Sequence, residues 1–146
     1  MRRRIMLGTM LFAAIVMTSG LCMAAGAVAV GEPADISKDG VAIYTRVNSA
    51  DSDTAKSGAL AGCRGLEHAS ATARSLCKIA ATFENQCVAQ ALDPQDGTPG
   101  FGWALASNSE EAKAQAMSNC RDTAGPTRQD ACVIGPKDVW CDGNAR

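Results

Sequence analysis

Two stretches of the chain carry the same spacing of alanine, lysine and cysteine. They are "TAKSGALAGCR", residues 54–64, and "EEAKAQAMSNCR", residues 110–121. In each, small residues recur every four positions and end at a cysteine followed by arginine. Residues four apart share one face of an α-helix. We therefore expect two helices whose small-residue faces lie close against a sheet, in a chain built from two copies of one unit.

The cysteines extend this repeat over most of the chain. Two ordered triples align with offsets of 57, 55 and 54 residues: Cys63, Cys77 and Cys87, and then Cys120, Cys132 and Cys141. This alignment predicts repeat units at about 40–92 and 100–141.

Runs of strand-forming residues flank both expected helices. "GVAIYTRV" from Gly40 and "GFGWALAS" from Gly100 precede the helices, and "CKIAATF", "CVAQAL" and "ACVIG" follow them. Ser107 with Glu110 resembles a capping box at a helix start, and "DPQDGTPG" at 93–100 has the composition of a turn. The predicted fold is α/β (α+β), with β-α-β-β and then β-α-β units. They form one small disulfide-stabilised sheet with two helices packed on it.

The N-terminal segment has the features of an export signal. Arg2, Arg3 and Arg4 precede an uncharged run that extends to Gly31, and a basic head before an apolar stretch is typical of a signal peptide. We expect a signal at 1–27 with cleavage after Ala27, and cleavage after Ala24 as the second choice. An uncleaved anchor is the alternative, since about 20 apolar residues span a bilayer.

Either reading places the remaining chain outside the cytoplasm, in the periplasm or secreted. The expected organisation is a linker at 28–39 and one disulfide-rich domain at 40–146. The chain has 14 Lys plus Arg and 15 Asp plus Glu. Loss of three arginines with the signal leaves 11 against 15, a net charge of −4. This acidic balance argues against a nucleic-acid partner, and no membrane contact is expected after cleavage.

Six cysteines in a small exported domain predict three disulfides. A metal site is disfavoured, because no C-x-x-C pair occurs and the chain has one histidine. Six cysteines allow fifteen pairings, and several of them respect the repeat. The expected pairing is Cys63–Cys77, Cys120–Cys132 and Cys87–Cys141. Because each unit as aligned holds three cysteines, at least one bridge should join the two units.

The sequence offers no recognisable catalytic set, so we expect a protein that is not an enzyme and has no cofactor. Cys63 lies near His68, but a cysteine in a disulfide is not a nucleophile. Asp93 and Asp96 lack the spacing of an EF-hand loop. Glu110 and Glu111 fall at a helix start, where carboxylates favour the helix dipole.

The motifs "FENQCVAQA" and "GFGWALASNSEEAKAQA", together with the paired Ala-x3-Ala-x3-Cys helices, resemble the bacterial domain-of-unknown-function family numbered 4189. The resemblance spans about Gly40 to Cys141. This chain departs from the family pattern in the long loops at 64–76 and 121–131 and in the first strand "GVAIY". The resemblance implies a small secreted α/β fold without an established activity, and suggests binding roles.

Two functions are compatible with these features. The first is a periplasmic or secreted protein-binding module, of inhibitor or immunity type, whose partner is a toxin or a cell-wall enzyme. Its contact elements would be the loops at 64–76 and 121–131 or the turn at 93–100. The alternative is a structural or envelope-stress protein without a specific enzyme target. Phe101, Trp103 and Leu105 share one strand face, which belongs either to the core or to a partner surface.

Overall fold

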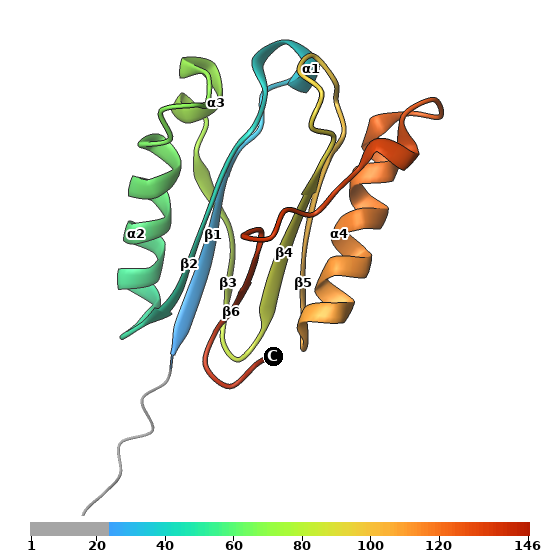
Figure 1. The fold of residues 1–146 in the computed structure, drawn as a ribbon. Coiled ribbons are helices and arrows are strands. Elements are labelled where there is room, and N and C mark those ends of the chain that lie inside the picture. The colour runs from blue at the N-terminus through green and yellow to red at the C-terminus, as the bar shows by residue number, and fades with distance from the viewer. Residues whose placement is uncertain (1–23) are drawn as a thin grey trace, which may run out of the picture.

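A computed structural model describes residues 24–146. The elements are β1 (Ala25–Gly31), α1 (Ile36–Asp39), β2 (Ala42–Ser49), α2 (Ser52–Arg64), α3 (Ala71–Ser75), β3 (Lys78–Phe83), β4 (Cys87–Leu92), β5 (Phe101–Ala106), α4 (Ser109–Ala124), a 3₁₀ turn (Gln129–Ala131) and β6 (Val139–Cys141). The strands form two three-stranded sheets, with orders β2-β1-β3 and β5-β4-β6. From left to right in Figure 1 the layers are α2, the first sheet, the second sheet and α4.

The predicted α/β class with two packed helices and three disulfides is confirmed, but the expected single sheet is wrong. The reason lies in the two faces of the central strands. In β1, Ala27 and Ala29 pack against α2, while Val28 and Val30 point to the other sheet. In β4, Ala89 faces α4 and Val88 faces the first sheet. Both faces are apolar, so each sheet needs a helix on one side and a second sheet on the other.

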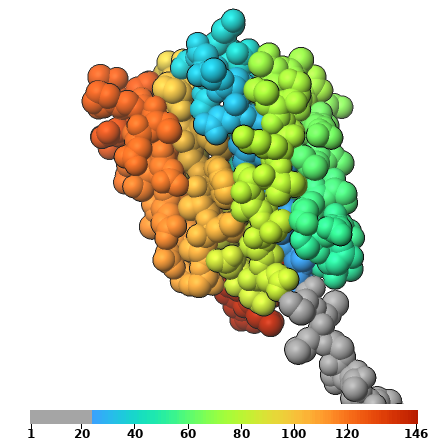
Figure 2. All heavy atoms as spheres, turned by 180° about the vertical axis from the view of Figure 1, so that it is seen from behind, coloured from blue at the N-terminus to red at the C-terminus, as the bar shows by residue number. Residues whose placement is uncertain are grey.

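The contact between the two sheets is visible from behind. In Figure 2 the yellow-green residues of β3 lie directly beside the light-orange residues of β5. Phe83 of β3 belongs to the inter-sheet core that Trp103 and Leu105 of β5 also contact. The shared face predicted for Phe101, Trp103 and Leu105 is therefore the face turned away from the helix.

The repeat is real, but its boundaries differ from the predicted ones. In both sheets the first strand of the unit is central, the second strand pairs on one side, and the strand after the helix pairs on the other. The unit is thus β-β-α-β, as β1-β2-α2-β3 and β4-β5-α4-β6. The predicted units at 40–92 and 100–141 assigned β4 to the wrong copy and omitted β1.

The expected linker at 28–39 is wrong, because it contains most of β1 and all of α1. Every residue of β1 is buried, and the strand pairs with β2 and β3. Most of the expected signal peptide lies outside the described residues. Its last residues, 25–27, are within β1, so cleavage after Ala27 would divide the central strand of the first sheet. Cleavage after Ala24 would leave that strand whole.

The three expected disulfides are present: Cys63–Cys77, Cys120–Cys132 and Cys87–Cys141. The first two tie equivalent helix ends to the chain that follows. The third does not join the two units, contrary to expectation, because Cys87 begins β4 and lies directly opposite Cys141 of β6 in the same sheet.

The aligned third pair of cysteines, Cys87 and Cys141, is therefore not a pair of equivalent positions. If Val28 is matched to Val88, Cys87 corresponds to Ala27, which lies opposite Thr82 in the first sheet. The second unit thus holds four of the six bridged cysteines, and the first holds two.

Polar residues begin the two long helices as the sequence predicted, with one shift. The side chain of Asp51 accepts a hydrogen bond from Thr54 N, and that of Asn108 accepts one from Glu111 N. Asn108, not Ser107, is therefore the N-cap of α4. The loops at 64–76 and 121–131 are partly helical, since they contain α3 and the 3₁₀ turn. Within residues 24–146, no helix has the length and apolar character needed to cross a membrane.

We predict that Gly102→Ala destabilises the protein by about 1–3 kcal/mol, because α4 lies directly on this residue. A Cβ at Gly102 would lie 2.3 Å from Cys120 N and 2.5 Å from Ala116 O. Gly58→Ala in α2 is the matched control. Its nearest contact would be Arg46 Cγ at 3.4 Å, and a helix gains up to about 1 kcal/mol from this change. Urea unfolding of the oxidised proteins measures both, and equal stabilities would contradict the close packing of α4.

Removal of a disulfide should lower the free energy of unfolding more for the bridge that spans the longer segment. The sequence separation is 54 residues for Cys87–Cys141 and 12 for Cys120–Cys132. From the entropy of loop closure, the two bridges stabilise the folded protein by about 4 and about 3 kcal/mol, respectively. The double variants Cys87→Ala/Cys141→Ala and Cys120→Ala/Cys132→Ala, compared by urea unfolding, test this order. The reverse order would show that native-state effects outweigh chain entropy.

Candidate functional site

The third strand of the second unit is interrupted, and this interruption breaks the symmetry of the repeat. In the first unit, β3 begins directly after Cys77. In the second, Val133 pairs with Leu92 through hydrogen bonds of 2.9 and 3.0 Å. The chain then leaves β4 and returns only at Asp138, whose carbonyl oxygen accepts from Gln90 N at 2.9 Å. The strand predicted at "ACVIG" is therefore wrong.

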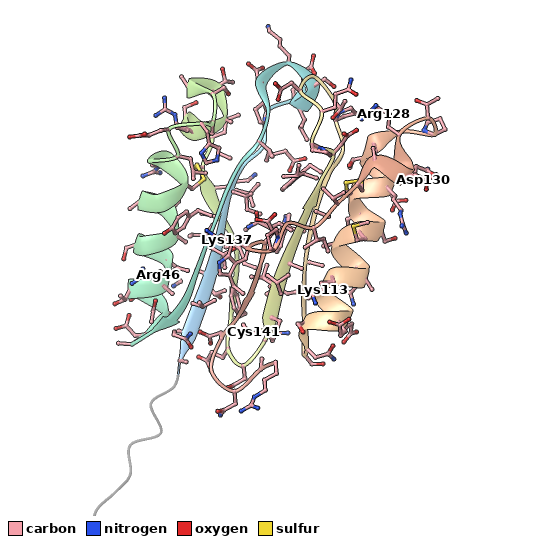
Figure 3. The ribbon with its side chains drawn as sticks, viewed as in Figure 1. Arg46, Lys113, Arg128, Asp130, Lys137 and Cys141 are labelled. Atoms are coloured by element: carbon pink, nitrogen blue, oxygen red, sulfur yellow. A yellow bond between two sulfur atoms is a disulfide. The ribbon has the colours of Figure 1, made fainter. Side chains whose placement is uncertain are left out.

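The interrupting segment, 134–138, closes on itself as a turn. Gly135 N donates to Asp138 Oδ2 at 2.9 Å, and Asp138 N donates to Gly135 O at 3.1 Å. Pro136 has no N–H to offer a neighbouring strand. Figure 3 shows Lys137 on the segment that crosses the front of the molecule from the α4 side. The Gly135-Pro136 pair was the sequence signal for this turn.

Because β6 is short, the inner face of β2 is not fully covered. A groove of about 390 Å³ lies there, between β2 and the β4–β6 side of the second sheet. We call it the β2–β6 groove. Its apolar lining comes from Val41, Ile43, Tyr44, Leu66, Leu92, Phe101 and Trp140. Its polar lining comes from Thr45, His68, Gln90 and Asp138.

Two of the four polar side chains of the groove are hydrogen-bonded to each other, and the other two are not part of that pair. Gln90 and Thr45 are joined across the two sheets, with Gln90 Nε2 donating to Thr45 Oγ1 at 3.3 Å. His68 is exposed, and Asp138 is held in the 134–138 turn. The groove thus has a mostly apolar wall with polar groups between and beside its apolar side chains, the usual composition of a binding site.

A second hollow of about 490 Å³ adjoins this groove, between α1, residues 68–70 and the 92–101 segment. The two share Val41, His68, Leu92 and Phe101. Leu92 is 41% exposed and lines both hollows. The predicted contact elements at 64–76 and 93–100 therefore both contribute to this end of the molecule.

The third predicted contact element, 121–131, braces the site instead of lining it. Arg128, at the upper right of Figure 3, donates through Nε and Nη2 to the carboxylate of Asp93, with a distance of 2.8 Å from Nη2 to Oδ1. The Asp93 side chain is fully buried. The Arg128 hydrogen bond, together with one from Gln95 N, lowers the pKa of Asp93 to about 2. This pair fixes the 93–100 turn beside the groove.

The side chains considered for catalysis are dispersed. Cys63 is buried in its disulfide, and Glu110 forms an exposed ion pair with Lys113 on α4. Asp93 is committed to Arg128, while Asp96 is exposed at the tip of its turn. Among the described residues, no three His, Cys, Asp or Glu side chains gather as a metal site would require.

Arg128→Gln should raise the pKa of Asp93 from about 2 towards its ordinary value near 3.8. Because the folded-state pKa is lowered, the pair stabilises the fold above about pH 4, and this contribution disappears as the pH falls towards 2. The variant should therefore be less stable than the wild type at pH 7, with a gap that closes in acid. Carboxyl ¹³C NMR titration and urea unfolding at several pH values measure both effects. An unchanged pKa of Asp93 in the variant would contradict the assignment.

A family model described as "Domain of unknown function (DUF4189)" matches residues 25–137. The match begins at the first residue of β1 and includes both long helices and most walls of the β2–β6 groove. It starts earlier than the resemblance from Gly40 had indicated. No curated protein and no solved structure matches the chain. The chain therefore belongs to the DUF4189 family of domains of unknown function.

Proposed function

We propose that this protein is an exported, non-catalytic binding module that holds an apolar segment of a partner protein in the β2–β6 groove. The observation that carries the proposal is the interrupted strand at 134–138, beside which Leu92 of β4 is exposed and Ile43 and Tyr44 of β2 are only half-buried. Aromatic and aliphatic side chains in a recess are the usual anchors of protein interfaces.

The charges near the groove indicate what flanks the apolar segment. Asp138 lines the groove. The adjoining hollow is lined by Asp39 and Asp96 and by one lysine, Lys38, so acidic side chains are in excess. After loss of the three N-terminal arginines the net charge is −4, by the arithmetic above. An apolar segment next to a lysine or arginine therefore matches this surface better than one next to an acid.

The groove is held in shape before any partner arrives. The Cys120–Cys132 bridge and the Asp93–Arg128 pair fix the chain on the two sides of its upper end. A rigid recess loses little conformational entropy on binding. This favours a role as an inhibitor or immunity-type protein that blocks a secreted toxin or a cell-wall enzyme.

Leu92 and Leu76 provide a matched pair of variants for a test. They are 41% and 45% exposed, respectively, and only Leu92 lines the groove. A displayed library of apolar-basic peptides, selected on the oxidised protein, should yield binders that lose at least about tenfold in affinity with Leu92→Ser. The loss of one buried leucine contact corresponds to this magnitude. Leu76→Ser should leave the affinity unchanged.

The same two positions identify the natural partner. A photo-crosslinking residue at position 92 should capture a discrete protein from periplasmic or secreted material, and one at position 76 should not. If selection gives no binder and neither position crosslinks, the groove has no protein partner and the proposal is wrong.

A further inference from the structure

The end of the molecule opposite the groove contains a buried carboxylate with an unsatisfied oxygen. Asp142 is fully buried. Its Oδ1 accepts a hydrogen bond from Asn48 N at 2.6 Å, but its Oδ2 accepts none from any described residue. No lysine, arginine or histidine among residues 24–146 forms an ion pair with it.

This arrangement is unfavourable as it stands. A carboxylate removed from water needs a cation or several hydrogen bonds to compensate its lost hydration. The Ser49 hydroxyl, next to Asn48 in the chain, is also buried and without a hydrogen-bond partner. Two unsatisfied polar groups thus lie near the same end of β2, and each would accept a hydrogen bond from a positively charged donor.

The chain enters β1 at this point. Ala25 lies directly opposite Ser49 in the β1–β2 pair. Ala24 approaches the C-terminal chain, since its Cβ lies 3.7 Å from the place that a Cβ on Gly143, the residue after Asp142, would occupy. Figure 1 shows the start of β1 and the C-terminus at the same end of the sandwich. The Ala24–Ala25 peptide bond therefore lies at the same end of the molecule as Asp142, between the end of β2 and the chain at Gly143.

We infer that the exported chain is processed between Ala24 and Ala25, and that the new α-ammonium group of Ala25 forms a buried ion pair with Asp142. Signal-peptidase hydrolysis of this bond consumes one water. It leaves a carboxylate on Ala24, which departs with the signal, and an amine on Ala25, which takes up a proton at neutral pH. The resulting ammonium has three donors for Asp142 Oδ2, the Ser49 hydroxyl and water.

Two further observations favour this bond over the one after Ala27. Ala25 and Ala27 both belong to the core between β1 and α2, so removal of residues 25–27 would open that core. The family match also begins at Ala25. Cys22 and Ala24 supply the small residues that a signal peptidase requires before the cut.

A second acid lines the same hollow as Ala25. Glu84, on the turn between β3 and β4, lines a shallow hollow together with Ala25, and it is exposed. An exposed acid attracts an ammonium group only weakly. The Glu84→Gln variant therefore separates general attraction from a specific pair with Asp142.

The first test is the mass and N-terminal sequence of the protein exported with its own signal. The mature chain should begin at Ala25. A start at Val28 would overturn the inference, as would retention of the signal.

The second test is a thermodynamic cycle in the exported protein. Asp142→Asn removes the acid, and insertion of Gly-Ser after Ala24 moves the ammonium away while the cleavage site is kept. Each change should lower the folding equilibrium constant on the order of a hundredfold. Together they should lower it by no more than about threefold beyond either alone, because they break the same pair. Independent, multiplicative effects would overturn the pair.

The third test does not depend on stability. The α-amino group, labelled by ¹³C reductive methylation, should titrate above the usual range of about 7.7–8.0. Asp142→Asn should abolish this increase, and Glu84→Gln should leave it in place. A titration that responds to Glu84→Gln and not to Asp142→Asn would overturn the assignment.

Discussion

Close contact between alanine-faced helices and sheets is the constraint on which this fold depends. Fourteen of the twenty-four buried apolar residues in the described chain are alanines. An alanine buries about one methyl group and stabilises less than a leucine or valine does. Such helices lie near the sheet backbone but contribute modest hydrophobic free energy. The three disulfides offset this deficit, and two of them bind the helix ends to the chain that follows.

The sequence predicted what depends on local pattern. The helical faces, four strands and the turn at 93–100 follow from periodicity and composition. The preferred disulfide pairing, one of several that respect the repeat, is confirmed. The prediction from sequence was wrong where one pattern is compatible with two structures. The apolar run through Ala25–Gly31 has the composition both of an export segment and of a buried central strand, so the sequence alone places β1 in the signal and linker. The number of sheets then could not be predicted, because a unit without its central strand gives no second sheet.

The candidate site was predicted only in part for a related reason. The loops at 64–76 and 93–100 do border the groove. The groove itself arises because residues 134–137 leave β4 between the Leu92–Val133 and Gln90–Asp138 hydrogen bonds. Gly135-Pro136 marks that break in the sequence, yet its effect on β2 depends on two sheets facing each other. A duplicated fold with both copies intact would cover this surface. The difference between the copies, not their likeness, therefore provides the recess.

The groove and the Asp142 cluster lie at opposite ends of the sandwich, and they place different demands on the protein. The groove needs apolar side chains left uncovered, which costs stability. The other end gathers β1, the β2 end, the β3–β4 turn and the C-terminal residues through Asn48, Asn85 and Asp142. The proposed ion pair of the Ala25 ammonium with Asp142 would connect the C-terminal residues and the end of β2 to β1. Its loss would weaken folding without altering the walls of the groove, so the proposed processing and the proposed binding can be tested separately.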